Sequence, residues 1–122
     1  DTLEAFLRGR RDLMISELAI TEVLSAVARR RREGMLTAHQ ALEIRDAVLA
    51  DADSGSFHRF DMSPVVHREA ERLLFHIESV ALRTLDALHV AVALLGSATH
   101  VVTYDARMRA AALHAGLRPL DL

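Results

Sequence analysis

The sequence has no cysteine, no lysine and no asparagine, and each absence excludes a kind of chemistry. Without cysteine there is no disulfide, no thiolate nucleophile and no cysteine-ligated zinc. All 15 basic residues are arginine, so P-loop and Schiff-base chemistry, which need a lysine, are excluded as well. Without asparagine there is no N-glycosylation sequon. Carboxylate, imidazole, hydroxyl and guanidinium groups are left to carry any reaction.

Aromatic residues and net charge are also scarce, at 4% and −2. The small net charge gives no general basic field, and few aromatic rings mean few stacking platforms, so nucleic-acid recognition would rest on shape and polar contacts. No apolar run approaches the ~18 residues of a membrane-spanning helix, and no signal peptide is visible. We therefore expect a cytoplasmic protein, and the missing lysine and asparagine suggest a bacterial genome rich in GC.

The 122 residues suit one compact domain with a real core, since 51% of them are hydrophobic. Apolar periodicity and capping residues predict helices at 2–8, 17–32, 38–52, 64–77, 84–95 and 106–115. Short apolar runs predict strands at 13–16, 57–62, 100–104 and 117–120. Strands separated by helices predict an α/β sandwich with a mainly parallel sheet, in which functional residues gather at the carboxyl ends of the strands.

One stretch, LRTLDALHVAVALL at 82–95, is almost a buried helix, yet it carries the carboxylate of Asp86 near its start. Thr84 is predicted to cap this helix. An acidic residue in the first turn is favoured by the helix dipole, which is one explanation for Asp86. The other explanation is a functional role, because an unpaired carboxylate is costly to bury.

Two further carboxylates have the same ambiguity when each is taken alone. Asp105 follows the strand HVVTY and suits a plain helix N-cap. Glu22 suits a solvated helix edge. Together, however, Glu22, Asp86 and Asp105 are predicted to lie at one edge of the sheet, where they repel one another unless a cation neutralises them. Oxygen ligands favour Mg²⁺ or Mn²⁺, and such an ion can activate water against a phosphodiester.

Four segments in series carry a family resemblance: SELAITEV at 16–23, LRTLDALHVA at 82–91, VVTYD at 101–105 and AALHAGL at 111–117. Their order and spacing resemble those of a PIN domain, and most closely the toxin ribonucleases of VapBC-type toxin–antitoxin pairs. The resemblance covers essentially the whole chain.

The resemblance implies a PIN-like three-layer sandwich and a metal-dependent endoribonuclease that is silenced by a cognate antitoxin. Three of the family's acidic positions correspond to Glu22, Asp86 and Asp105, which would bind Mg²⁺ or Mn²⁺ directly or through water. Thr103 corresponds to the hydroxyl residue that supports the last acid. RNA is the implied substrate. The implied partners are an antitoxin, which places an Arg near the carboxylates, and a second copy in a homodimer.

The family pattern begins with a central strand that carries a first acid, and no such strand precedes Asp1 in residues 1–122. Although Asp1-Thr2 looks similar, the residues that follow correspond to the family's next helix, so we do not assign Asp1 as a ligand. We therefore expect residues 1–122 to form a single PIN-like domain that is incomplete at its N-terminus.

Arginine and histidine residues supply weaker candidates. Arg83, three residues before Asp86, is the preferred RNA contact. The run Arg29–Arg32 suits a solvated helix end, with phosphate contact as the alternative. His89 suits helix packing or support of a ligand rather than ligation, and the other histidines lack zinc spacing. A non-catalytic PIN-like module that binds a protein partner through apolar helices is the alternative function.

Overall fold

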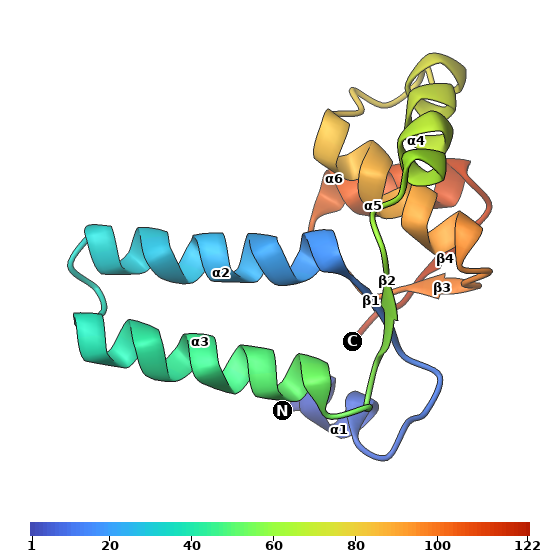
Figure 1. Ribbon diagram of the computed structural model, residues 1–122. Coiled ribbons are helices and arrows are strands. Elements are labelled where there is room, and N and C mark those ends of the chain that lie inside the picture. Colours follow the sequence, from blue (N-terminus) through green and yellow to red (C-terminus); the bar gives the residue numbers. More distant parts are fainter.

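The computed structural model describes residues 1–122 as six helices and four short strands (Figure 1). Every predicted helix is confirmed to within about one residue. In chain order the elements are α1 Thr2–Leu7, β1 Met14–Ser16, α2 Glu17–Arg32, α3 Ala38–Asp53, β2 His58–Phe60, α4 Pro64–His76, α5 Thr84–Leu95, β3 His100–Val101, α6 Ala106–His114 and β4 Arg118–Pro119. None of the helices combines the length and apolar character that crossing a membrane requires.

The strands form two separate parallel pairs, β1 with β2 and β3 with β4. Parallel pairing and the α/β class are confirmed, but the single sheet that we predicted is not formed. The strand predicted at 100–104 ends at Val101, and residues 102–105 form neither strand nor turn. In this segment the Thr103 hydroxyl accepts a hydrogen bond from the Asp105 backbone N–H. The three-layer sandwich and the N-terminally incomplete domain stay predictions.

The core is built around α5, which is buried along most of its length. Three of its buried residues, Ala87, Ala91 and Ala93, have small side chains that let neighbouring helices approach closely. Helix α4 packs along it through Val66, Ala70 and Leu73, and α6 packs through Met108, Ala111 and Ala112. The nearly continuous apolar surface of α5 therefore requires helices on more than one side.

Local caps explain where the helices begin. Thr37 and Gln40 form the predicted capping box, in which each side chain accepts a hydrogen bond from the other residue's backbone N–H, at 3.1 and 2.9 Å. The predicted cap at Thr84 is wrong by one residue. Arg83 is the N-cap residue of α5, and the Asp86 carboxylate accepts a hydrogen bond from the Arg83 backbone N–H at 3.2 Å.

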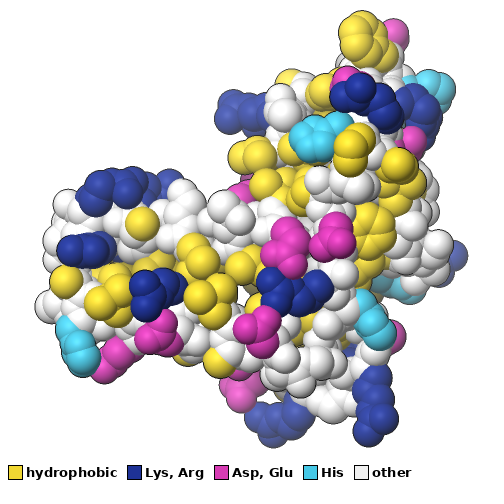
Figure 2. Space-filling view, in the orientation of Figure 1, with side chains coloured by type: hydrophobic (Ala, Val, Ile, Leu, Met, Phe, Trp, Pro, Cys, Tyr) yellow, Lys and Arg dark blue, Asp and Glu magenta, His cyan; other side chains and the backbone are white.

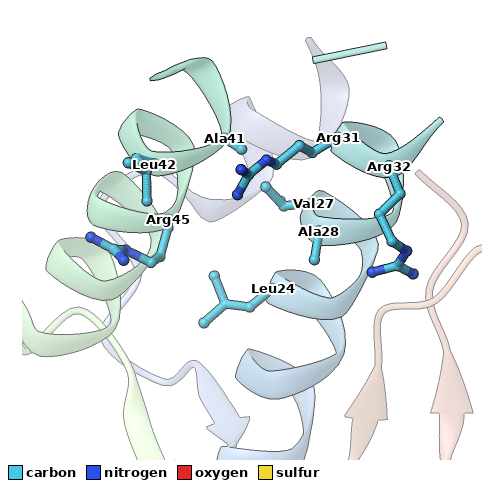
Figure 3. A pocket seen from close by; sticks show the side chains of 8 residues that line it. All are labelled: Leu24, Val27, Ala28, Arg31, Arg32, Ala41, Leu42 and Arg45. Atoms are coloured by element: carbon cyan, nitrogen blue, oxygen red, sulfur yellow. The ribbon is translucent and has the colours of Figure 1, made fainter. Parts of the chain in front are cut away.

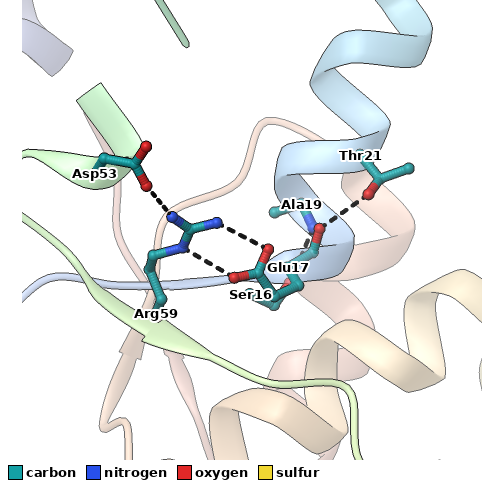
Figure 4. Close-up of polar contacts among 6 residues, drawn as sticks. All are labelled: Ser16, Glu17, Ala19, Thr21, Asp53 and Arg59. Atoms are coloured by element: carbon teal, nitrogen blue, oxygen red, sulfur yellow. Dashed lines mark hydrogen bonds and ion pairs between the residues drawn. The ribbon is translucent and has the colours of Figure 1, made fainter. Parts of the chain in front are cut away.

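Helices α2 and α3 lie antiparallel and project together away from α4, α5 and α6; we call this pair the arm (Figure 1). An ion pair braces the base of the arm (Figure 4). The guanidinium of Arg59, on β2, donates two hydrogen bonds to Glu17 at 2.9 and 3.0 Å and a further one to Asp53. The bonds to Glu17 raise the pKa of Arg59 above its usual range, so the side chain stays charged and links both helices to the strand.

We expect Leu73→Ala to lower the free energy of unfolding by about 2–5 kcal/mol, because Leu73 is 2% exposed between α4 and α5. Phe75→Ala removes a larger side chain from the same helix, but Phe75 is 88% exposed, so its effect should stay within about 0.5 kcal/mol. Urea unfolding of both variants measures the difference. Equal losses would show that the α4–α5 contact is not part of the core.

Candidate functional site

Glu22 is held against α5 by a side chain far away in the sequence. It lies in the second turn of α2, a helix that Ser16 caps by accepting a hydrogen bond from the Ala19 backbone N–H at 3.0 Å. Its Oε1 lies 2.5 Å from Nε2 of His89, and the two side chains are 42% and 24% exposed. The Glu22 side chain is therefore not simply solvated at the edge of α2, because it contacts His89 directly.

Asp86 lies one turn before His89 on α5, so both side chains are on the same side of that helix. Its Oδ2 accepts the hydrogen bond from the backbone of Arg83, which is the structural role that a first-turn carboxylate can fill. Asp86 is half-buried rather than enclosed by the core. Glu22, on α2, and Asp86, on α5, are therefore linked only through His89, which contacts Glu22 and lies one turn after Asp86.

Asp105 and Thr103 lie in the segment between β3 and α6, and each of their side chains accepts a hydrogen bond from a backbone N–H. Oδ1 of Asp105 accepts a hydrogen bond from the Met108 backbone N–H at 2.8 Å, which makes Asp105 the N-cap of α6. The Thr103 hydroxyl accepts a bond from the Asp105 backbone N–H at 3.1 Å. Thr103 thus fixes the backbone of Asp105 and not its carboxylate.

The three acids do not form a metal-binding cluster as the structure stands. No three acidic or histidine side chains lie close enough together to hold an ion. The donor chemistry suits a hard cation, since all the candidate ligands are carboxylate oxygens, but the arrangement does not complete a site.

The charges of these acids are nevertheless uncompensated by arginine. Seven arginines pair with carboxylates elsewhere, and none of them pairs with Glu22, Asp86 or Asp105. Those seven are Arg8, Arg10, Arg45, Arg59, Arg68, Arg72 and Arg109. Arg83 is exposed and is not among them, so its guanidinium is available to an external anion.

Two residues beside Asp105 were missed by the sequence interpretation. Tyr104 is 73% exposed, although an aromatic ring in an apolar strand is normally read as part of the core. Arg107, in the first turn of α6, pairs with no carboxylate, and it was given no role beyond its place in the predicted helix. Early termination of β3 at Val101 is the feature that leaves Tyr104 outside the core.

The PIN domain family model matches residues 1–113, which is nearly the whole chain. This chain therefore belongs to the PIN domain family. Members of that family are generally metal-dependent nucleases, which use ions such as Mg²⁺ or Mn²⁺. No curated protein and no solved structure matches the chain.

We expect Asp105→Ala to lower the free energy of unfolding by about 0.5–2 kcal/mol, because the Met108 backbone N–H loses its cap. Asp105→Asn keeps an acceptor oxygen, so it should cost about 0.5 kcal/mol or less. Thermal or urea unfolding compares the two. If both variants lose equal stability, capping is not what this side chain contributes, and the asparagine variant cannot be used to isolate its charge.

Proposed function

We propose that this PIN domain is an endoribonuclease that depends on Mg²⁺ or Mn²⁺ and acts as the toxin of a toxin–antitoxin pair. Family membership supports nuclease activity. The observation that carries the proposal is that the family's acidic positions, Glu22, Asp86 and Asp105, keep carboxylates that no arginine neutralises. Such carboxylates are available to a cation.

The proposed roles follow from what each side chain contacts. Glu22, Asp86 and Asp105 contribute to the metal site directly or through water, while Thr103 supports Asp105 through its backbone. His89 supports Glu22. Arg83 contacts RNA phosphate, since it is exposed at the start of the helix that carries Asp86. Because the three carboxylates do not form a cluster by themselves, assembly of the site requires side-chain movement or a further ligand.

We expect the full-length protein to cleave RNA in the presence of Mg²⁺ or Mn²⁺, and we expect EDTA to abolish this cleavage. Asp86→Asn and Asp105→Asn should each lower cleavage by at least about 100-fold, which exceeds the usual effect of a residue that only supports a metal ligand. Asparagine retains the cap, so the loss reports the charge rather than the fold. Release of a fluorescent fragment from labelled RNA measures the rate.

Asp46→Asn is the matched control, because Asp46 lies on α3 and pairs with Arg45, away from the proposed site. It should leave cleavage unchanged. Full activity in Asp86→Asn or Asp105→Asn would refute the site assignment. Cleavage that persists in EDTA would refute the metal dependence.

The arm supplies the surface that we propose for the antitoxin. Apolar side chains remain open on it, including Val23, Met35 and Leu42, which are 43%, 61% and 45% exposed. Figure 2 shows hydrophobic side chains interspersed with arginine over this pair of helices. An apolar surface of this kind is typical of an interface with another chain.

A groove of about 480 Å³ runs between α2 and α3 (Figure 3). It is lined by Leu24, Val27, Ala28, Arg31, Arg32, Ala41, Leu42 and Arg45. All of its charged side chains are basic, and Arg31 and Arg32 pair with no carboxylate of the chain. An antitoxin segment that carries apolar side chains flanked by acidic ones would complement this groove. A homodimer, the other proposed assembly, would have to leave the groove open.

We expect expression of the full-length protein alone to slow growth and co-expression of the adjacent small gene to restore it. Leu42→Glu should weaken the complex at least 10-fold, because it places an acid where the groove is apolar. Leu113→Glu is the control, since Leu113 is 62% exposed on α6, away from the arm. Isothermal titration of the purified partner measures both affinities.

A non-catalytic interaction module is the second candidate function. The exposed apolar arm favours it, and so does the absence of an assembled metal cluster. Partner binding without any metal-dependent cleavage would support this module, as would harmless expression of the full-length protein. Growth inhibition that is lost in Asp86→Asn would contradict it.

A further inference from the structure

The three candidate acids are divided between two parts of the fold. Asp86 is in the first turn of α5 and Asp105 is the N-cap of α6, so the packing of these two helices fixes where the two acids lie relative to each other. Glu22 is instead on α2, in the arm. Its position relative to Asp86 and Asp105 therefore depends on the angle at which the arm leaves the rest of the chain.

The arm is anchored to the rest of the protein near its base (Figure 1). Leu18 is the one arm residue that packs against the main hydrophobic core. Three carboxylates make the charged contacts that join the arm to other elements, and they are Glu17, Glu22 and Asp53. All four residues lie in the first two turns of α2 or at the end of α3. A few side chains therefore set the angle of the arm.

Arg59 holds both arm helices at once (Figure 4). It lies opposite Ile15 in the β1–β2 pair, beside the point where β1 continues directly into α2. Its guanidinium bonds both oxygens of Glu17, at 2.9 and 3.0 Å, and also bonds Asp53. Two parallel bonds to one carboxylate fix its direction as well as its distance. A swing of α2 about its first turn would have to break them.

An exposed ion pair taken alone contributes little free energy. The Arg59 pair differs from this case, because the Arg59 and Glu17 side chains are only 33% and 39% exposed and the guanidinium reaches a second carboxylate. A modest free energy is also enough here, since few other side chains oppose a change in the angle of the arm.

We propose that Arg59 is a positioning residue, whose bonds to Glu17 and Asp53 hold the arm at the angle that keeps Glu22 against His89. The proposal rests on the metal-dependent function proposed above. Arg59 bonds none of the three candidate acids, so it acts on Glu22 through α2. The arm also carries the groove, so a partner that changes the angle of the arm on binding there would change the position of Glu22 too.

The angle of the arm is measured first, in full-length protein without metal. Residues 1–122 contain no cysteine, so nitroxide labels are placed at His39→Cys on the arm and Leu113→Cys on α6, where the native side chains are exposed. Double electron–electron resonance measures the distance between the labels. We expect one narrow distance distribution when Arg59 is present and a broader one in Arg59→Gln.

Arg72→Gln is the matched control. Arg72 also bonds a carboxylate through two nitrogens, but its partner is Glu69 on the same helix, α4. The control therefore removes the same charge and a similar ion pair without releasing one element from another. It should leave the distance distribution narrow.

Mn²⁺ affinity, measured by electron paramagnetic resonance, tests the effect on the acids. Arg59→Gln should weaken binding by about 2- to 30-fold, the range for residues that act on a site without touching its ligand. Electrostatics alone predicts the opposite sign, because a protein that loses a positive charge attracts a cation more strongly. Arg59→Lys keeps the charge but lacks the planar fork, so it should also weaken binding. Arg72→Gln should not.

The outcomes separate this inference from the function on which it rests. A narrow distance distribution in Arg59→Gln would overturn the positioning role alone, and so would unchanged or tighter Mn²⁺ binding in either Arg59 variant. Equal effects of Arg72→Gln and Arg59→Gln would overturn it as well. A wild-type protein that binds no Mn²⁺ would overturn the proposed metal site and the role of Arg59 toward it together.

Discussion

Burial of α5 is the constraint on which the rest of the structure depends. Ala87, Ala91 and Val90 are at most 1% exposed, so this helix needs cover along most of its circumference. Helices α4 and α6 provide it, and the small alanine side chains allow them to come close. The start of α5 is where this cover ends, and there Asp86 is half-buried with one oxygen on the backbone of Arg83. The position of Asp86 is thus a consequence of how the core is packed.

The same packing fixes the elements that carry the other candidate acids. His89, one turn along α5 from Asp86, contacts Glu22 of α2, while α6 packs on α5 behind the Asp105 cap. Each acid has a structural bond that holds it in place, and none has an arginine partner. The arm differs from this part of the chain, because only Ile20, Ala41 and Ala52 are buried in its two helices. The packed helices that carry Asp86 and Asp105 therefore adjoin a sparsely buried pair of helices, whose exposed apolar side chains suit a partner.

Sequence patterns were informative wherever the determining contacts are local. The Thr37 capping box and the Asp105 cap depend on residues three positions apart, so they could be read directly from the chain, whereas the cap of α5 was placed one residue too late. The contact between Glu22 and His89 joins residues 67 positions apart, and no local pattern encodes it. The separation of the strands into two pairs and the exposure of Tyr104 also escaped prediction. Both depend on which strands pair with one another across the fold, and strand pairing is not encoded by neighbouring residues.

Binding of Mn²⁺ to the full-length protein, measured by electron paramagnetic resonance, tests most directly whether the carboxylates form a metal site. Wild type should bind the ion, and the triple variant Glu22→Gln, Asp86→Asn, Asp105→Asn should bind it at least about 100-fold more weakly. The control for net charge is a second triple variant, which changes acids on the arm: Glu33→Gln, Glu43→Gln and Asp46→Asn. It should leave Mn²⁺ binding unchanged. Equal Mn²⁺ affinity in wild type and in the variant that lacks Glu22, Asp86 and Asp105 would contradict the account.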